Sequence, residues 1–376
     1  MMLTRRTLLG LLSSLALPRT LFAAEPLAPD LVSAARRIAR RFMAENKHER
    51  NYRFYLALEA LLELSAATGE AEYRQHVLRI IDRRGWKPTT DVSFNEQSFE
   101  CLTYALYRTS GEQAWLDVFL RQSALCRLKK ERSPEGAVMH ARGRERGGGY
   151  ALLLDAMQEY VARMARAGKH SDDATYFTEA ARQIRLYRQI VRDESTGLWH
   201  QGRGWLGDAP ERVSPGVWSR GHGWLLRGLS TAVIATPRER PEFTELRAVF
   251  VELAEALIAR QQPSGMWHCL LEQPPDKTPA ESSGTAMIAT ALSRVWRAGI
   301  TTDPRHREAV EKAFRALPAF VDSDGRALST SPGPGPLESE ANYFTNSFPP
   351  GNDHGTFALM FAAAEAVAFD KFVATQ

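Results

Sequence analysis

The stretch that decides the fold is a helix-stop, helix-start signal that occurs twice. Residues 68–73 read Thr-Gly-Glu-Ala-Glu-Tyr, and residues 110–115, 42 positions further along, read Ser-Gly-Glu-Gln-Ala-Trp. In each copy an apolar helical pattern ends at Thr or Ser followed by Gly, the residue most often found just past a helix C-terminus. A new helical pattern then begins with an aromatic residue in its first turn. A period of about 40 residues with this signal predicts a series of helical hairpins.

Helical patterning extends outward from this repeat over almost the whole chain. Apolar residues recur at three-and-four spacing through 31–42 and 52–66, the spacing of one face of an α-helix. A looser copy of the signal stands at 171–176, and strand signals such as Asn-Gly turns are scarce. The chain is therefore predicted to be all-α. Further helices are expected at 176–192, 222–236, 242–262, 282–298, 304–318 and 354–372.

A closed ring of six hairpins, an (α/α)6 barrel, is the architecture that this repeat predicts. Inner helices of such a ring are surrounded by other helices, so they should be small and apolar on most faces. The alanine-rich segments 286–291 and 358–364 fit that description. An open solenoid of the tetratricopeptide type is the alternative, but its period of about 34 residues and its consensus are not found.

Bulk composition sets loose limits. The chain has 376 residues, 44% hydrophobic and 24% charged, as in ordinary globular proteins, with 48 basic against 44 acidic residues. No long basic run with interleaved aromatics is present, so no nucleic-acid partner is expected. The three cysteines fall in no zinc-binding spacing, and no metal site is expected. A disulfide between Cys101 and Cys126 would need an oxidising compartment; a buried thiol is the default reading.

Residues 1–24 have the parts of an export signal. Arg5 and Arg6 form a twin-arginine pattern, an apolar run follows over 8–17, and Phe-Ala-Ala stands at 22–24. The apolar run is too short to span a bilayer, which takes about 20 residues. We therefore expect export to a periplasm or beyond. A single barrel domain over 25–376 should follow, with no membrane span in the mature protein.

The segment 215–224, Pro-Gly-Val-Trp-Ser-Arg-Gly-His-Gly-Trp, has the composition of a ligand-binding stretch. Trp218 and Trp224 could offer flat faces to a sugar ring, and the Arg220 guanidinium is a fork of donors matched to a carboxylate. The glycines between them would let backbone approach a ligand closely. The alternative is a glycine-rich turn whose tryptophans are ordinary core residues.

These motifs resemble those of a known enzyme family. Trp-x-Arg-Gly-x-x-Trp at 218–224, Gly-Leu-Trp-His at 197–200, Glu-Ser-Ser-Gly-Thr-Ala-Met at 281–287 and Gly-Asn-Asp-His-Gly-Thr-Phe at 351–357 fall in the order found in unsaturated glucuronyl and rhamnogalacturonyl hydrolases. Those enzymes form glycoside hydrolase families 88 and 105, and the resemblance spans roughly residues 50–370. It implies an (α/α)6 barrel, which the hairpin repeat predicts independently.

The resemblance also implies a reaction. Such enzymes remove a 4,5-unsaturated uronic acid from the non-reducing end of oligosaccharides left by polysaccharide lyases. An aspartate protonates the double bond and directs water to C5, and the resulting hemiketal opens and releases the next sugar. This is hydration of a vinyl ether and differs from the two-carboxylate displacement of other glycosidases. It needs a carboxyl that keeps its proton near neutral pH.

Asp155 is the residue that the resemblance assigns as this acid. It lies in Leu-Leu-Asp-Ala-Met, 45 positions before His200, and its apolar neighbours would raise its pKa if it faces the cavity. The alternative is a solvated helix aspartate, since Gln158 and Glu159 follow. A second register aligns the family's aspartate with Gly148, inside a triple glycine, and would leave the site without its acid.

The families use a second acidic residue early in the chain. The corresponding stretch is Phe-Asn-Glu-Gln at 94–97, so that acid is either replaced by Asn95 or supplied by Glu96. Glu96 would tune Asp155 through like-charge proximity. The alternative is a carboxylate that stabilises a helix N-terminus.

Three histidines complete the predicted site. His200 follows Trp199 in a turn and is the best ligand contact among the nine histidines. His222 stands where the families vary, so it is predicted to set subsite preference. Arg220 is predicted to bind the uronate carboxylate or a neighbouring hydroxyl. His354, in an Asn-Asp-His-Gly helix-entry turn, is a weaker candidate for substrate binding.

The sequence thus predicts an exported glycoside hydrolase that acts on acidic oligosaccharides. No cofactor is expected, because the glycines at 147–149 lack the Lys-Ser/Thr of a nucleotide-binding loop. One alternative is a polysaccharide lyase on the same barrel, with His200 and Tyr150 performing β-elimination. Another is a carbohydrate-binding protein that kept the tryptophan/arginine pocket and lost its acid.

Overall fold

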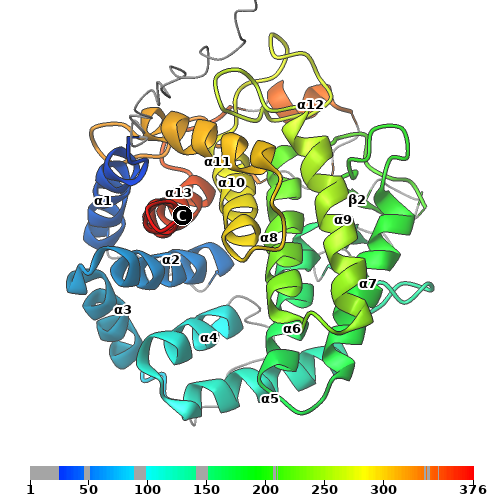
Figure 1. The fold of residues 1–376 in the computed structure, drawn as a ribbon, viewed down its shortest axis with the longest axis horizontal. Coiled ribbons are helices and arrows are strands. Elements are labelled where there is room, and N and C mark those ends of the chain that lie inside the picture. Colours follow the sequence, from blue (N-terminus) through cyan, green and yellow to red (C-terminus); the bar gives the residue numbers. More distant parts are fainter. Residues whose placement is uncertain are drawn as a thin grey trace, which may run out of the picture.

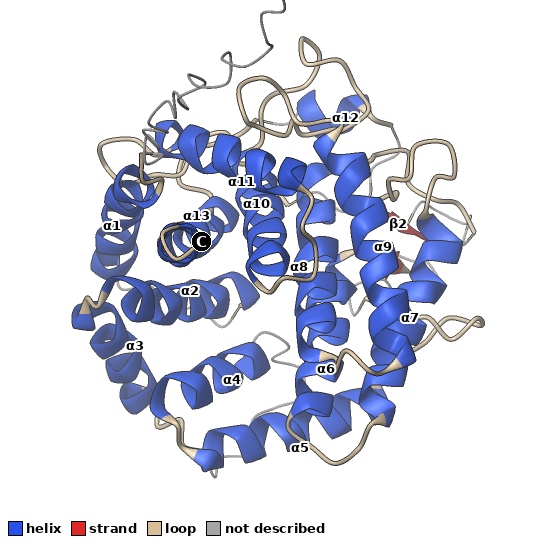
Figure 2. Cartoon of the chain, viewed as in Figure 1, coloured by secondary structure: helices blue, strands red, loops and turns tan. Residues whose placement is uncertain are grey.

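Helices of the chain alternate between an outer and an inner ring (Figures 1 and 2). The computed structural model describes residues 25–45, 51–88, 99–140, 151–205, 209, 211–333, 336, 339–345 and 347–376. The outer helices are α1 (Ala28–Glu45), α3 (Ala71–Arg83), α5 (Gln113–Lys129), α7 (Thr175–Val191), α9 (Pro241–Ile258) and α11 (Pro304–Ala316). The inner helices are α2 (Tyr52–Thr68), α4 (Phe99–Ser110), α6 (Ala162–Lys169), α8 (Ser219–Ala235), α10 (Ser282–Arg297) and α13 (Asp353–Val373). The all-α (α/α)6 barrel is confirmed.

Minor elements lie between the paired helices. A π-helical turn, η2 (Met157–Val161), runs directly into α6, and a two-stranded antiparallel ribbon pairs β1 (Leu152–Leu153) with β2 (Gly202–Arg203). The 3-10 helix η3 (Leu317–Phe320) and the short helix α12 (Ala341–Thr345) belong to the connection between α11 and α13. All of these elements stand on connections that lead into an inner helix.

The repeated sequence signal is the inner-to-outer turn of a hairpin. Gly69 and Gly111 follow the last residues of α2 and α4 with φ values of 80° and 74°, in the left-handed region that favours glycine. The Gly69 N–H donates to the Ser65 carbonyl, and the Gly111 N–H donates to the Tyr107 carbonyl, each at 2.8–2.9 Å. The 42-residue period is therefore one complete hairpin.

The inner helices owe their close packing to small residues. Ala286 and Ala289 on α10 and Ala358 and Ala362 on α13 are fully buried, as the sequence predicts for an inner ring. A Cβ on Gly223 would lie 2.8 Å from the Cβ of Met287, so this glycine lets α8 approach α10. The prediction that it lets backbone approach a ligand is wrong, because that space is filled by the neighbouring helix.

Connections of very different length leave the two ends of the barrel. Because inner and outer helices alternate, all inner helices run in the same direction, with their N-termini at one end. The connections that enter them are long: α7 ends at Val191 and α8 begins at Ser219, and α11 ends at Ala316 well before α13. Only two residues separate α2 from α3, and two separate α4 from α5. We call the N-terminal ends of the inner helices the loop end, and the opposite side the turn end.

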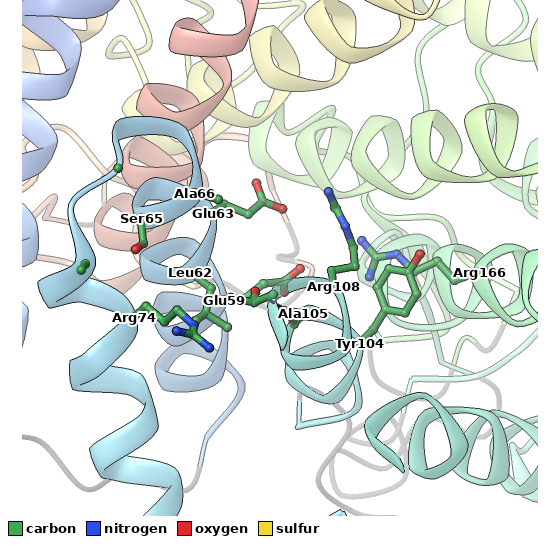
Figure 3. Close-up of a pocket in the computed structure, with 13 residues that line it drawn as sticks. Glu59, Leu62, Glu63, Ser65, Ala66, Arg74, Tyr104, Ala105, Arg108 and Arg166 are labelled. Atoms are coloured by element: carbon green, nitrogen blue, oxygen red, sulfur yellow. Dashed lines mark hydrogen bonds between the residues drawn. The ribbon is translucent and has the colours of Figure 1, made fainter. Parts of the chain in front are cut away.

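The inner ring has one loose joint. Neighbouring inner helices pack closely in the order α13, α2, α4 and again in the order α6, α8, α10, α13, whereas α4 and α6 do not pack closely along their backbones. Side chains join them: the Arg166 guanidinium lies over the Tyr104 ring, 4.8 Å from its centroid, and the Tyr104 hydroxyl is 3.1 Å from His170 Nε2. Figure 3 shows this joint opening into a cavity at the turn end.

The ring closes between the first and last helices. Asp370 on α13 accepts the N–H groups of Leu27 and Ala28, at 3.1 and 2.8 Å, and so caps the start of α1. Cys126 is a buried thiol outside any disulfide, as the default interpretation predicts, and the alternative of a Cys101–Cys126 bridge is not realised. In the described part of the chain, none of the helices combines the length and apolar character needed to cross a membrane.

Candidate active site

Ionisable side chains that could take part in catalysis gather at the loop end, in the first turns of inner helices. Tyr52 is the first residue of α2, Arg220 the second of α8, and His354 the second of α13. Asp155 lies between β1 and η2, at the entry to α6. The charge of Asp155 acts to raise the pKa of both Tyr52 and Arg220, as expected of neighbouring groups. Helix N-termini carry partial positive charge, so this end favours an anionic ligand.

Asp155 has the environment of a carboxyl group that keeps its proton. Burial raises its pKa to about 7, and the nearby Glu159 carboxylate acts in the same direction, while Arg220 opposes them. Its Oδ2 atom is buried and has no hydrogen-bond partner among the described residues. The interpretation of Asp155 as a solvated surface aspartate is therefore wrong. A raised pKa and an oxygen without a hydrogen-bond partner are properties that a proton donor needs.

Glu159 is part of a small charged group one turn beyond Asp155. Its carboxylate lies 3.7 Å from Lys130 Nζ and 4.0 Å from His140 Nε2. The π-helical turn widens the helix between the two acids, and such turns are frequent at functional sites. The sequence offered Glu159 only as a polar neighbour, because its partners lie on other connections.

Tyr52 and His354 form a hydrogen-bonded pair across α2 and α13. The Tyr52 hydroxyl lies 2.6 Å from His354 Nε2, and His354 Nδ1 lies 3.0 Å from Asn352 Oδ1. Nδ1 therefore carries the hydrogen, and Nε2 accepts one from Tyr52. Burial holds the pKa of His354 well below its usual value, with the Arg220 charge adding to the effect, so the ring is neutral. Burial likewise raises the pKa of Tyr52 to about 12.

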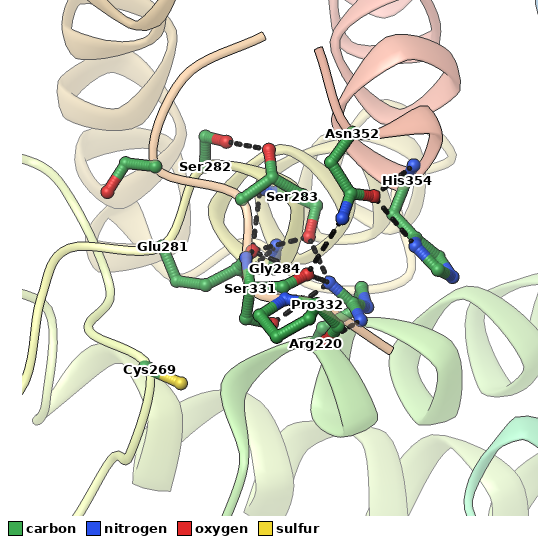
Figure 4. A network of polar contacts seen from close by, with 12 residues as sticks. Arg220, Cys269, Glu281, Ser282, Ser283, Gly284, Ser331, Pro332, Asn352 and His354 are labelled. Carbon is green, nitrogen blue, oxygen red and sulfur yellow. Dashed lines mark hydrogen bonds and ion pairs between the residues drawn. The ribbon is translucent and has the colours of Figure 1, made fainter. Parts of the chain in front are cut away.

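Arg220 binds the protein's own backbone. Its Nη1 donates to the Ser331 carbonyl at 2.7 Å and its Nη2 to the Pro332 carbonyl at 2.8 Å (Figure 4). The side chain is fully buried and lies over the Trp218 ring, 4.3 Å from its centroid. In this structure the guanidinium thus anchors the 329–333 loop. A direct contact with a uronate carboxylate stays a prediction.

Glu281 holds the same loop from the opposite side. It is the N-cap of α10, and its Oε1 accepts from the Ser331 N–H at 3.0 Å and from the Ser283 hydroxyl at 2.6 Å. The Arg220 Nη1 lies 3.7 Å from the same oxygen, and both side chains are fully buried. The Glu-Ser-Ser-Gly motif is therefore a clamp that fixes the 329–333 loop beside the N-terminus of α13.

The two tryptophans lie in the interior. Trp218 is 2% exposed and Trp224 is 3% exposed. One face of Trp218 is covered by Arg220, and its Nε1 donates to the Ser331 hydroxyl at 3.2 Å. Trp224 packs against Phe357 with a centroid separation of 5.7 Å. The expectation of two open stacking faces is wrong, because the 329–333 loop and α13 cover them.

His222 is a structural residue. Its Nδ1 donates to the Trp218 carbonyl at 2.9 Å, and its Nε2 accepts from the Trp199 N–H at 3.0 Å. Burial lowers its pKa to about 4, so it stays neutral. With both nitrogens bonded to backbone, the ring has no free hydrogen-bonding atom for a substrate, and the prediction that it sets subsite preference is not supported by this geometry.

His200 differs from its neighbours in keeping an unused atom. The residue is partly buried, and its Nδ1 has no hydrogen-bond partner in the described part of the chain. A role in substrate binding stays a prediction. Four residues of the sequence analysis lie outside the described residues: Asn95, Glu96, Gly148 and Tyr150. The identity of the second acid and the alternative alignment at Gly148 therefore stay predictions.

No group of three or more His, Cys, Asp or Glu side chains suited to hold a metal ion occurs among the residues that the structure describes.

Tyr52 is the main contact that sequence reasoning missed. It was named only as the first residue of a predicted helix, because its partner His354 stands 302 positions away. The signal was its place immediately after the helix cap Asn51.

The chain belongs to Glycosyl Hydrolase Family 88, whose family model matches residues 33–369. It is thus a glycoside hydrolase. The match begins within α1 and ends within α13, so it includes all or most of every helix of the two rings and the motifs at 197–200, 218–224, 281–287 and 351–357.

Curated relatives carry more specific names. The unsaturated rhamnogalacturonyl hydrolase YesR of Bacillus subtilis (strain 168) is 23% identical over 289 residues, which cover 77% of this chain and 81% of that protein. The unsaturated 3S-rhamnoglycuronyl hydrolase of Alteromonas sp. (strain LOR) is 26% identical over 222 residues, 58% of this chain and 51% of that protein.

Solved structures agree on the fold. A possible member of the GH105 family from Klebsiella pneumoniae superposes with a TM-score of 0.76 at 20% identity, covering 90% of this chain and 93% of that one. At 20% identity this likeness establishes the barrel fold alone. The reaction has to be argued from the side chains at the loop end.

Proposed function

We propose that this glycoside hydrolase removes a 4,5-unsaturated uronic acid from the non-reducing end of short acidic oligosaccharides. The observation that carries the proposal is Asp155: its Oδ2 is buried and unpartnered, and its pKa of about 7 lets it hold a proton near neutral pH. Relatives named as unsaturated rhamnogalacturonyl and rhamnoglycuronyl hydrolases support the same substrate class.

Asp155 is the proton donor in the proposed reaction. It delivers its proton to the carbon–carbon double bond, and the resulting carboxylate accepts a proton from the water that adds at C5. The hemiketal at C5 then opens and releases the next sugar. A single carboxyl therefore acts first as acid and then as base, which requires a pKa near the working pH.

The electrostatics of the loop end suit an anionic sugar. The first turns of α2, α8, α10 and α13 converge there, and their N–H groups carry partial positive charge. Burial holds the pKa of His222 and of His354 below the usual range, so both rings are neutral and neither competes with Asp155 for the proton. In our proposal the Tyr52 hydroxyl, held by His354, contacts the sugar beside Asp155.

Glu159 has a tuning role in this scheme. Its negative charge favours the protonated form of Asp155, and Lys130 and His140 keep Glu159 itself in a polar setting. We therefore describe it as a positioning residue, since it acts on substrate only through Asp155.

The test is an absorbance assay on a disaccharide generated by a polysaccharide lyase. Hydration removes the conjugated double bond, so the ultraviolet absorbance of that bond should decay when the protein is added. A lyase would leave the disaccharide unchanged and raise the absorbance of intact polymer. A carbohydrate-binding protein would change neither signal, and either of these results would overturn the proposal.

We also propose that the barrel acts outside the cytoplasm. Arg5, Arg6 and the apolar run over 8–17 support twin-arginine export. Fusing residues 1–30 to a reporter that is active only after export tests this, with the Arg5→Lys, Arg6→Lys double variant as control. Reporter activity that is unchanged in the double variant would contradict the twin-arginine route.

A further inference from the structure

The turn end of the barrel is hollow. Two adjoining cavities of about 460 and 650 Å³ open there, on the side away from Asp155. They share five lining residues, namely Glu63, Ala66, Tyr104, Arg108 and Arg166, which come from α2, α4 and α6. The hollow therefore follows the loose joint between α4 and α6 (Figure 3).

The charges that line the hollow do not balance. The cations are Arg74, Arg108, Arg166, Lys169, Arg294, Arg297 and Lys371, and the carboxylates are Glu59, Glu63 and Glu365. Each carboxylate is already engaged. Glu63 lies 2.6 Å from Arg294, Glu365 lies 2.7 Å from Arg297, and Glu59 lies 3.7 Å from Arg227.

Arg166 is the unusual member of this set. It is only 7% exposed, yet it makes no hydrogen bond and no ion pair with the residues that the structure describes. Its guanidinium lies over the Tyr104 ring, and its charge lowers the pKa of Glu59 and Glu63 without a direct ion pair. Arg108 on α4 likewise makes no hydrogen bond or ion pair within the described chain, and both side chains point into the same cavity.

Compensation of helix dipoles accounts for cations at this end in general, since the inner helices all terminate here. Several cations at this end bond to helix-terminal carbonyls or to carboxylates: Lys371 donates to the Ala67 carbonyl at 3.3 Å, and Arg238 to the Ala298 carbonyl at 2.8 Å. Arg108 and Arg166 do neither. Arg108 is exposed and Arg166 is buried, and both act on Glu63 through electrostatic attraction alone. Their N–H donors line the hollow without a protein acceptor among the described residues, so the dipole explanation does not cover them.

We propose that Arg108 and Arg166 form a second binding site, for the oxyanion group of a small molecule. A carboxylate, phosphate or sulfate placed between them would accept paired N–H bonds from two planar guanidinium forks. Tyr104 holds the Arg166 fork in place, and the hollow admits a ligand of sugar size. The site is independent of Asp155 and of the proposed reaction.

The experiment measures binding of three probes to the full-length protein by calorimetry: inorganic phosphate, inorganic sulfate and glucuronate. Arg166→Gln and Arg108→Gln should each weaken one binding component about tenfold or more. Arg166→Lys, which keeps the charge and loses the fork, should weaken it less. Arg79→Gln on α3 is the matched control, since it removes the same charge from an exposed position outside both cavities.

The three probes distinguish the source of the oxyanion. Binding of glucuronate alone would assign a sugar acid, and binding of phosphate or sulfate would assign an inorganic or ester anion. If no binding component of any probe responds to Arg166→Gln in a variant with native circular dichroism, the proposal is wrong. Equal weakening by Arg79→Gln would also overturn it, as a general charge effect. Turnover is not measured, so this result does not bear on the hydrolase assay.

Discussion

The loop end and the turn end of the barrel are built from the same six inner helices, yet they differ in almost every property. At the loop end, long connections bring together a protonated aspartate, a neutral histidine and a tyrosine, and two buried side chains clamp the backbone. At the turn end, connections as short as two residues leave a hollow lined by cations. Helix direction explains both: N-termini favour an anionic ligand, and C-termini attract basic side chains. The scaffold fixes the electrostatic sign of each end, and loop length decides which end is elaborated.

The largest expected effect is on the chemistry of the loop end. Asp155→Asn should lower kcat by about 10²–10⁴-fold, because the amide cannot donate the proton. Binding of the disaccharide, followed by tryptophan fluorescence, should persist. Asp117→Asn, an exposed aspartate on α5, is the matched control and should keep full activity. If Asp155→Asn turned over the disaccharide as fast as the wild type, Asp155 would not be the acid, and the acid would have to be sought in the segments outside the described residues.

The clamp at the loop end should dominate stability. Glu281→Ala removes the acceptor of the Ser331 N–H and leaves the buried Arg220 charge without its partner. We expect the free energy of unfolding to fall by about 3–5 kcal/mol, measured by urea denaturation. Glu255→Ala, which breaks the exposed pair with Arg305, should change it by less than about 1 kcal/mol. Similar losses in both variants would refute the clamp.

Stability should also depend on pH through Asp155. Its pKa is raised from 3.8 to about 7 in the folded chain, so its stabilising contribution is complete below about pH 4 and is lost as pH rises through 7. Asp155→Asn avoids the buried charge. Near pH 8 its Tm should exceed that of the wild type by about 2 °C or more, and near pH 4 the difference should shrink. A lower Tm for the variant at pH 8 would contradict the buried setting.

A smaller effect is expected from Glu159. Besides burial, two charged groups act on the pKa of Asp155: Glu159 on η2 raises it, and Arg220 on α8 lowers it. Glu159→Gln should shift the alkaline fall of kcat/KM toward lower pH by about one unit, because the protonated acid loses support. Glu159→Asp keeps the charge and should restore the wild-type profile. If the pH profile of kcat/KM were unshifted in Glu159→Gln, Glu159 would have a purely structural role.

The smallest expected effect lies at the turn end. Gly111→Ala forces a side chain into left-handed backbone, although nothing lies within 4 Å of the added Cβ. We expect a loss of about 1–2 kcal/mol in the free energy of unfolding, with kcat/KM unchanged. Gly111→Asn, which tolerates this conformation better, should lose less. A change in kcat/KM would show that the two ends are coupled.

Local signals in the sequence predicted the fold well. The Gly69 and Gly111 stops set the hairpin period, and the alanines of α10 and α13 marked inner helices, because a closed ring constrains residue size directly. The raised pKa of Asp155 was predicted from its apolar neighbours, and its catalytic role, which rests on the family resemblance, stays a proposal. Each of these features depends on residues that are close together in the sequence.

Other parts of the site depend on distant contacts and could not be read in this way. The glycines beside Trp218 and Trp224 suggested an open platform, but the 329–333 loop and α13 bury both rings. His222 was expected to face substrate, whereas backbone from the Trp199 turn occupies its second nitrogen. Neither the 23 positions between Trp199 and His222 nor the 113 between Trp218 and Ser331 match a helical period, so these contacts leave no periodic trace in the sequence.

The capping of α1 by Asp370 has a consequence for how the molecule is made. The first helix of the barrel finds its acceptor only on the last helix, more than 340 positions later. During synthesis the early hairpins therefore emerge as an open arc, with unsatisfied N–H groups at its leading edge. Ring closure is the step of greatest sequence separation and should be slow relative to hairpin formation. Joining Gln376 to residue 25 by a short linker and reopening the chain in the turn between α8 and α9 should make this contact local and speed closure.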